Sequence, residues 1–428
     1  MSFSLSRPTQ RIIPALLAGL CLIGVAAGGE DANDTGWLEA LGARESLTDG
    51  LGGVGRSLED LGFHWCLAAT QVYQTNLHGG QATHRRAGRY AGSYDLDLEF
   101  DLDKIAGLRG GVFFMGVEGS WSDGLDASSI GSFFGVNDDA GGDAAIMISE
   151  AWYEQNWLDG RVLFRVGKVD LTGTVLCHNC PVAFDGSMYA NDETAQFLNG
   201  ALVNNPTIPF PDNGLGAMLY IEPLKGFYVS AGVADAQGDA RETGFRTAFH
   251  GPDNFFGIFE TGVVPRLCGM DGAYRVGFWY DPQPKDRLTS GTKRDDMGLY
   301  LSCDQMVLKE VADDADDTQG LGLFARWGYA HSDVAEITHF WSVGGQYQGM
   351  IPGRDDDVLG AGVAQGRISK YARSAGRDAQ ETVLEIYYNA KVCGWLNITG
   401  DVQYVANPGA DKRVGDAVVV GIRAQMNF

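Results

Sequence analysis

The chain has 428 residues, with 55 Asp and Glu against 32 Lys and Arg, which gives a formal net charge of −23. This acidity argues against a nucleic-acid-binding protein and against a polybasic membrane-surface anchor, because both need an excess of basic side chains. The length allows two or three soluble domains, or a single large barrel.

The first 27 residues have the pattern of a secretory signal peptide. Arg7 and Arg11 form a charged region before a short apolar stretch, Ile12 to Val25, and Val25-Ala26-Ala27 offers a small-residue cleavage site. This stretch is too short for a spanning helix, and no later run of about 18 apolar residues follows. A membrane location would therefore require strands in a closed barrel, which satisfies every backbone polar group in lipid.

Residues 28–62 differ from the rest of the chain. Leucines recur there with a weak helical period in a glycine-rich background. We predict a short, partly helical segment that is periplasmic or associated with a pore.

From residue 63 onward, the pattern is that of strands. Between Tyr94 and Asp103, apolar and acidic residues alternate at every position, and Val418 to Phe428 shows a similar alternation. Side chains along a strand point to opposite faces in turn. A soluble sandwich would bury the apolar face, whereas a membrane barrel turns it to lipid. The sixteen predicted strands are 63–76, 93–103, 110–121, 145–157, 160–169, 214–222, 226–234, 255–263, 272–281, 296–304, 320–330, 337–348, 357–366, 382–391, 394–405 and 415–428.

Blocks of sequence spread over most of the chain resemble the OprB-type carbohydrate-selective porins. The central block is SEAWYEQNWLDGRVLFRVGKVDLTG, and the chain closes with VVVGIRAQMNF, which ends on an aromatic residue. The order of the blocks, rather than any one of them, carries the resemblance. The other blocks are residues 48–65, 73–80, 90–102, 197–237 and 381–410.

This resemblance implies an all-β fold, a transmembrane antiparallel barrel of about sixteen strands over residues 63–428 in the bacterial outer membrane. It also implies passive, sugar-selective diffusion of small sugars without a cofactor. The expected partners are sugars, outer-membrane lipid and lipopolysaccharide, and an assembly machinery that recognises Phe428. The chain is more acidic than the family leads us to expect. The oligomeric state, monomer or trimer, stays open.

Strand alternation predicts which charged side chains face the lumen. Rings of such side chains set the selectivity of a pore. They are Asp95, Asp97, Glu99, Asp101, Arg161, Arg165, Arg275, Arg326, Glu385, Asp401 and Arg423. For each, the alternative is a wall residue that only pairs with its neighbours.

The central block is the predicted constriction. Its charged residues are Glu150, Glu154, Arg165, Lys168 and Asp170. Lys168 breaks the alternation, which would fit either a strand end where a loop folds inward or a salt bridge at the rim. The long connection 170–213 is accordingly either an infolded pore loop or a solvated external loop.

Of the seven cysteines, Cys177 and Cys180 form a CHNC motif. A structural zinc site needs about four ligands, and no second pair lies nearby. We therefore predict a local disulfide, which an oxidising compartment favours, and no metal.

Three alternatives to a sugar porin remain open on the sequence alone. A general, cation-preferring porin would explain the acidity. A secreted carbohydrate-binding β protein would need its apolar strand faces buried. An outer-membrane barrel enzyme would need catalytic residues, and the sequence contains no GxSxG, HExxH or Walker motif.

Overall fold

The computed structural model describes residues 40–84, 88–172, 184–191, 196–249, 251, 253–311, 317–373 and 377–428. Residues Glu45–Phe428 form one compact unit, which contains every strand of the described chain. The predicted signal peptide, residues 1–27, lies outside the described residues.

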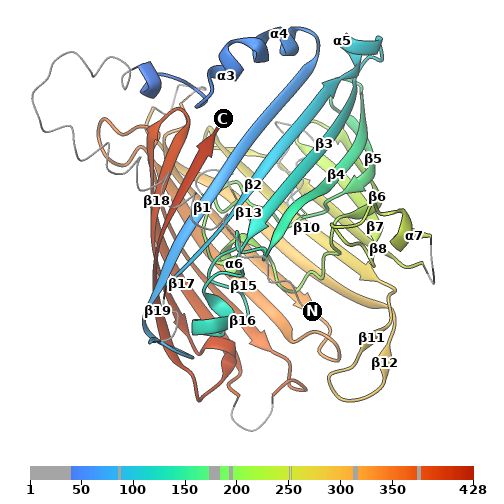
Figure 1. Cartoon of the computed structure of the whole chain (residues 1–428). Coiled ribbons are helices and arrows are strands. Elements are labelled where there is room, and N and C mark those ends of the chain that lie inside the picture. Colours follow the sequence, from blue (N-terminus) through green and yellow to red (C-terminus); the bar gives the residue numbers. More distant parts are fainter. Residues whose placement is uncertain are drawn as a thin grey trace, which may run out of the picture. The chain divides into compact units, whose positions relative to one another are not determined.

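Seventeen strands of the described chain belong to one sheet. Sixteen of them form a closed antiparallel ring, because β1 pairs with β2 on one side and with β19 on the other (Figure 1). The short β9 (Arg266–Leu267) only extends β10. The ring strands are β1 (Phe63–Gly80), β2 (Gly88–Asp101), β3 (Gly111–Trp121), β4 (Ala144–Trp157), β5 (Val162–Val169), β6 (Gly214–Leu224), β7 (Phe227–Asp235), β8 (Phe255–Val263), β10 (Met270–Asp281), β13 (Asp296–Lys309), β14 (Gly320–Ala330), β15 (Ile337–Gln348), β16 (Val358–Ile368), β17 (Gln380–Cys393), β18 (Leu396–Ala406) and β19 (Gly415–Asn427).

The prediction of an all-β barrel with about sixteen strands is confirmed. Each predicted range overlaps one ring strand, although several strands run further than predicted. β1 continues to Gly80 and β13 to Lys309, in both cases through an irregularity in the pairing register. Backbone pairing can continue past a bulge after the side-chain alternation has ended.

The two faces of the wall have opposite character. On β13, Leu301 is 49% exposed while its neighbour Ser302 is 3% exposed, and on β10 Val276 is 44% exposed beside Arg275 at 5%. The apolar residues thus point outward and many polar ones inward, as in a barrel surrounded by lipid. This contradicts the alternative of a secreted β protein, which required buried apolar strand faces.

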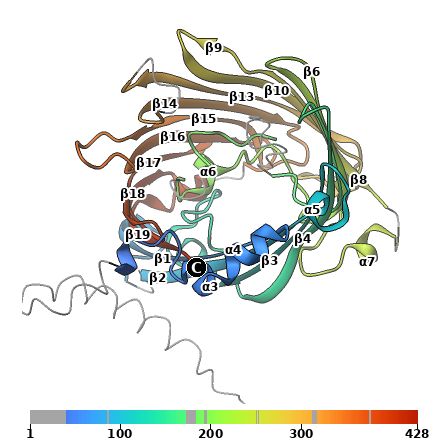
Figure 2. The ribbon, with the colours of Figure 1, turned by 90° about the horizontal axis from the view of Figure 1, so that it is seen from above.

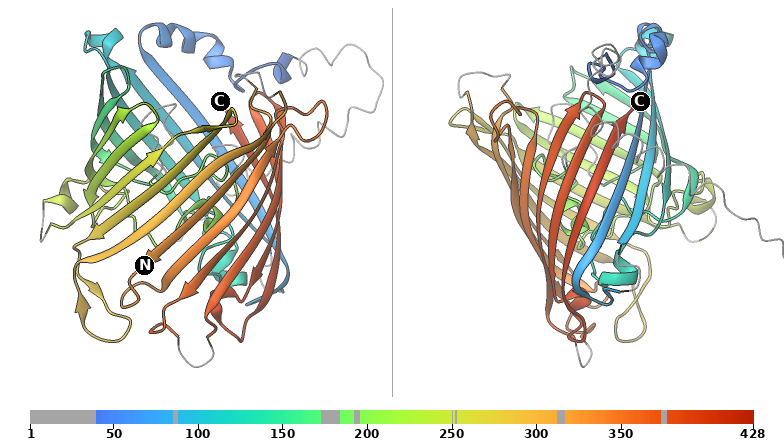
Figure 3. Two further views of the ribbon diagram at one scale, coloured as in Figure 1. Left: turned by 180° about the vertical axis from the view of Figure 1, so that it is seen from behind. Right: turned by 60° about the vertical axis from the view of Figure 1, so that its left-hand side comes forward.

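The connections differ in length at the two ends of the ring. Residues 122–143, 170–213, 236–254 and 282–295 connect strands at one end, which we call the long-loop end (Figure 3). Tight turns at 158–161, 225–226 and 394–395 lie at the other, the short-turn end. Outer-membrane barrels place short turns in the periplasm and long loops outside the cell.

The segment before β1 contains helix, as predicted. It forms α3 (Asp49–Gly52) and α4 (Val54–Asp60) at the short-turn end. The Leu47 amide donates to the Asn427 carbonyl at 2.9 Å, and Lys104 donates to the Glu59 carbonyl at 3.1 Å. These bonds tie the segment to β19 and to α5 (Leu102–Ala106). Among the described helices, none is both long and apolar enough to cross a membrane.

The outward orientation of Leu301 gives a first prediction. Leu301→Arg places a charge in the lipid-facing belt and should lower the free energy of unfolding by about 2–4 kcal/mol if the site lies near the bilayer midplane. The measurement is reversible unfolding in guanidinium chloride from liposomes. Thr292→Arg, in the exposed strand β12 (Thr292–Lys293) of the long-loop end, is the matched control and should change stability little. Equal effects of both substitutions would contradict the assigned orientation.

Candidate pore-lining site

Two of the long connections fold into the ring. Residues 122–143 carry η2 (Asp126–Ile130), and residues 170–213 carry α6 (Gly200–Val203), which lies within the circle of strands in Figure 2. The Asp138 amide donates to the Leu198 carbonyl at 2.8 Å, and Asn204 Nδ2 donates to Asp138 Oδ1 at 3.0 Å. The two inward loops thus support each other. Of the two alternatives for 170–213, the described parts follow the infolded one.

Apolar packing fixes the inward loops to the wall. Phe197 and Leu202 are fully buried in a cluster with Phe324 of β14 and Val383 of β17. Glycines in the wall allow the close approach. A Cβ atom added to Gly328 of β14 would lie 2.0 Å from an oxygen of the loop residue Thr207, so a larger residue would displace the loop.

Inward carboxylates of β17 bind the backbone of the loops. Glu385 is fully buried and accepts hydrogen bonds from the Leu198 and Asn199 amides at 2.7 and 2.9 Å. Glu381 likewise accepts from the Phe133 amide at 3.1 Å. A loop inside a barrel has unpaired backbone donors, and these carboxylates satisfy them.

Inward arginines satisfy the loop carbonyls in the same way. Arg326 is 2% exposed and donates to the carbonyls of Asp185, Leu202 and Val203. Arg423 is fully buried and donates to the Gln196 carbonyl at 2.7 Å. Both side chains point inward, and the loops cover them.

Two further predicted residues are also covered. Arg275 is 5% exposed and pairs with Asp304 at 2.7 Å, and the Ser187 hydroxyl of the inward loop donates to that same carboxylate. Asp401 is 3% exposed and accepts from Gln403 Nε2 at 2.9 Å. These charges serve the packing between wall and loop.

The central block forms a stack on the inner face of β3, β4 and β5. Phe114 stacks on Trp152 at 4.7 Å between centroids, and the Arg165 guanidinium lies 3.7 Å above the same indole. Arg165 also bonds Glu154 at 3.0 Å, and Trp152 Nε1 donates to Glu150 at 2.9 Å. Both faces of Trp152 are therefore occupied, and the indole does not offer a free face to a sugar ring.

The other two constriction candidates are at the end of β5. Lys168 lies two residues after the exposed Val166 and so shares the outer face of β5, whereas Arg165 lies on the inner face. The Lys168 ammonium donates to the carbonyls of Ile148, Ala240 and Glu242. It fastens the 236–254 loop to the wall. The Asp170 amide donates to Glu150 at 3.2 Å, and so marks the point where the inward loop begins.

Of the remaining candidates, two lie at the short-turn end. Arg161 is exposed and donates to the carbonyls of Glu222 and Pro223. Asp101 ends β2 and accepts from the Asp103 and Lys104 amides, which caps α5. Each therefore holds a turn.

The acidic side chains of β2 are less buried than the inward arginines. Asp97 is exposed, and Asp95 and Glu99 are half-buried. Gln74 of β1 points inward, because its Nε2 donates to the carbonyl of the loop residue Val136 at 2.7 Å. Cys66 lies eight residues before Gln74 and so shares its face of β1, and Asp97 of β2 is the register partner of Cys66. These acids thus face inward.

The sequence analysis missed further acidic residues near Asp95, Asp97 and Glu99 of β2. Coulombic repulsion couples Asp95 with Glu118 of β3 and with Asp139 of an inward loop. Glu118 lies inside the predicted strand 110–121 and is its single charged residue, so alternation could have found it. Asp138 and Asp139 lie in a loop, where no periodic pattern indicates direction.

The loop acids hold their protons more tightly than usual. Asp138 is exposed, but the surrounding protein removes much of its bulk water. This burial, followed by repulsion from Asp139, raises the pKa of Asp138 to about 6. Burial also raises the pKa of Asp139, while Arg423, at 3.8 Å, opposes that rise.

The predicted disulfide between Cys177 and Cys180 lies outside the described residues. Within the described ranges, Cys66, Cys268, Cys303 and Cys393 are present as thiols rather than disulfides. The same ranges contain no group of three or more His, Cys, Asp or Glu side chains arranged to hold a metal ion.

Comparison with known proteins extends over most of the chain. A family model described as "Carbohydrate-selective porin, OprB family" matches residues 85–428. Porin B of Pseudomonas aeruginosa is 24% identical over 99% of both chains, and the putative porin QuiX of Acinetobacter baylyi is 21% identical over 90% of this chain and 93% of its own. The high-pH structure of Pseudomonas putida OprB has a TM-score of 0.76 at 21% identity, covering 90% of this chain and 99% of that one.

Glu385 gives a second prediction. Glu385→Ala leaves the buried Leu198 and Asn199 amides without their acceptor, at a cost of about 1–3 kcal/mol for each. The inward loop should loosen, and single-channel currents in planar bilayers should become noisier and less uniform in size. The control is Glu310→Ala, at an exposed turn of the short-turn end. Currents of Glu385→Ala that match those of the control would contradict the anchoring role.

Asp138 gives a third prediction, on pH. Its carboxylate is charged above about pH 6 and neutral below it, so lowering the pH removes negative charge from the inward loop. Cation preference, measured as the reversal potential in a KCl gradient, should fall between about pH 8 and about pH 5. Asp138→Asn should reduce this change, and Asp123→Asn, at an exposed position of the same loop, should not. An identical pH response in both variants would refute the assignment.

Proposed function

This protein belongs to the OprB family of carbohydrate-selective porins of the outer membrane, and we propose that sugars cross it beside an acidic face of the inner wall. The acidic face consists of Asp95, Asp97, Glu99 and Glu118 on β2 and β3, together with the loop acids Asp138 and Asp139. Sugars move down their gradient, without a covalent step.

One observation carries the proposal. The inward arginines Arg275, Arg326 and Arg423 are only 5%, 2% and 0% exposed, because they bind Asp304 or the backbone of the inward loops. These three arginines are kept out of contact with water, whereas Asp97 remains exposed. A passage bordered by exposed acids repels anions and leaves neutral solutes unhindered.

The central stack has a supporting role in this proposal. Glu150, Glu154 and Arg165 narrow the passage from the side of β4 and β5. Arg165 is held by Glu154, and Glu150 is held by Trp152 Nε1 and the Asp170 amide. Lys168 and Asp170 influence the passage indirectly, because they hold the adjoining loops against the wall.

A general, cation-preferring porin is the second candidate function, and the same acidic face favours it. In that case size and charge alone would govern passage. The two candidates differ in how they treat sugars and amino acids of similar mass.

Family membership points to a channel rather than an enzyme. Several finer predictions remain. We propose that residues 45–62 face the periplasm, and that Phe428, whose amide donates to the Leu67 carbonyl at 2.9 Å, is recognised during assembly. Contacts with lipopolysaccharide and the state of monomer or trimer also stay predictions.

The test is liposome swelling with refolded protein. Neutral monosaccharides should enter faster than size-matched amino acids, and an anionic sugar acid should enter more slowly than its neutral parent sugar. The triple variant Asp95→Asn, Asp97→Asn and Glu99→Gln removes three carboxyl groups from the acidic face and should raise the rate for the sugar acid several-fold, with little change for the neutral sugar.

The matched control is Asp355→Asn, at an exposed turn of the short-turn end. Equal rates for sugars and amino acids would leave only the general porin. An unchanged rate for the sugar acid in the triple variant would refute the assigned passage.

A further inference from the structure

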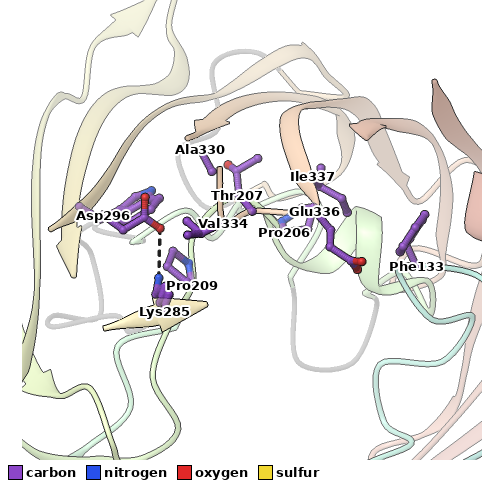
Figure 4. A pocket seen from close by; sticks show the side chains of 12 residues that line it. Phe133, Pro206, Thr207, Pro209, Lys285, Asp296, Ala330, Val334, Glu336 and Ile337 are labelled. Carbon is purple, nitrogen blue, oxygen red and sulfur yellow. Dashed lines mark hydrogen bonds and ion pairs between the residues drawn. The ribbon is translucent and has the colours of Figure 1, made fainter. Parts of the chain in front are cut away.

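The connections at the long-loop end differ in the side of the wall on which they pack. The β10–β13 and β14–β15 connections approach the two inward loops, and these four parts of the chain surround a pocket of about 450 Å³ (Figure 4). Lys285 of the β10–β13 connection contacts Asp281 at 2.9 Å and Asp296 at 3.1 Å, the latter drawn as a dashed line in Figure 4. The described residues that line this pocket include none of the β7–β8 connection, residues 236–254.

The β7–β8 connection is held against the outer face of the wall. Lys168 lies on the outer face of β5, and its ammonium donates to the carbonyls of Ala240 and Glu242 at 2.7 and 2.6 Å. The Ala240 amide also donates to the Asp212 carboxylate at 3.0 Å. The first half of the connection is therefore fixed by hydrogen bonds on the side of the wall that faces lipid.

The next residues continue along the same side. A Cβ atom added to Gly244 would lie 3.0 Å from a side-chain carbon of Leu215, which is the register partner of Lys168 on β6. The short helix α7 (Phe245–Ala248) begins directly after this close contact. Figure 2 accordingly shows α7 outside the ring of strands.

This helix presents two phenylalanine rings away from the wall. Gly244 and Ala248 are buried, whereas Phe245 and Phe249 are 62% and 64% exposed. Residues four apart on a helix lie on the same face, and the two ring centroids are 6.3 Å apart. Both rings are more exposed than the lipid-facing Leu301, at 49%. Adjacent large apolar side chains with so little cover indicate an interaction surface.

The rings lie beside the lipid-facing surface of the barrel. On the outer face of the neighbouring strands, Val166 of β5, Val233 of β7 and Phe255 of β8 are 41%, 40% and 40% exposed. Phe255 begins β8 directly after the connection. Lipid acyl chains cover the outer face of a membrane barrel. The apolar surface thus extends from a face that contacts lipid to the two rings.

Basic side chains next to the rings suit the boundary between acyl chains and headgroups. The Arg246 side chain is 79% exposed and lies 3.9 Å from Glu242, and Arg241 is exposed as well. A long basic side chain can keep its charged end in a polar layer while its apolar neighbours lie in the acyl region. The residues of this connection therefore combine the two properties that a segment at a membrane surface needs.

The protruding turn is too small to form an interface with a second copy of the chain by itself. Two phenylalanine side chains bury about 300–500 Å² at most. A standard protein interface buries about 800 Å² on each partner. Lipid has no such minimum area, since each ring can insert among acyl chains separately.

We propose that the β7–β8 connection is a lipid contact of the outer leaflet, in which Phe245 and Phe249 insert among acyl chains just below the headgroups. The contact does not depend on which solute crosses the barrel. Because Lys168 ties the same connection to the wall, the inserted rings hold this side of the barrel at a fixed depth in the membrane.

The test is photo-crosslinking of the full chain refolded into liposomes of phosphatidylethanolamine and phosphatidylglycerol. The photoreactive analogue p-benzoylphenylalanine replaces Phe245 or Phe249, and mass spectrometry measures the lipid adducts after irradiation. Each position should give a yield close to that of the same analogue at Leu301. The yield should be several-fold higher than at Ser290, an exposed residue of the turn before β12 at the same end.

Two results would overturn the proposal. One is a yield of lipid adduct at both phenylalanine positions no higher than at Ser290, which would mean that the rings face water. The other is crosslinking to a second copy of the chain in place of lipid, which would identify an interface between barrels. The Leu301 adduct confirms insertion in the same liposomes.

Discussion

Closure of the backbone hydrogen-bond ladder is the constraint on which the rest of the structure depends. Within lipid there is no water to satisfy an open strand edge, so the first strand must pair with the last. β1 and β19 do so from Ala68 opposite Asn427 to Gly80 opposite Gly415. Once the ring is closed, strand parity divides every side chain between lipid and interior, and a single residue changes sides only at a bulge.

The interior must then satisfy the loops that fold into it. A loop inside a barrel carries backbone amides and carbonyls that no strand pairs with. Charged side chains of the wall take that role: Glu385 accepts from two loop amides and Arg326 donates to three loop carbonyls. The Arg326 guanidinium is charged, and hydrogen bonds to charged groups are worth more than neutral ones, which suits a loop that must keep its place inside the barrel.

This use of the wall charges has an electrostatic consequence. The buried arginines are engaged with loops and with Asp304, whereas acids such as Asp97 stay in contact with water. Some of the chain's many acidic residues therefore give one face of the inner wall a negative charge. At the long-loop end, by contrast, Lys285 is balanced by Asp281 and Asp296.

The sequence by itself determined the barrel, the number of strands and the direction of most wall side chains. Period-two alternation is a local property, and residues such as Arg275 and Glu385 point inward as alternation requires. Only the tertiary structure decided which of them meet water. Burial of Arg326 depends on a loop more than 100 residues away in the chain, as its bonds to Leu202 and Val203 show. Loop acids such as Asp138 have no periodicity to predict their direction, and the pocket beside Lys285 exists because four separate segments converge. Contacts between distant segments leave no local pattern in the sequence, and that is the physical reason for the division.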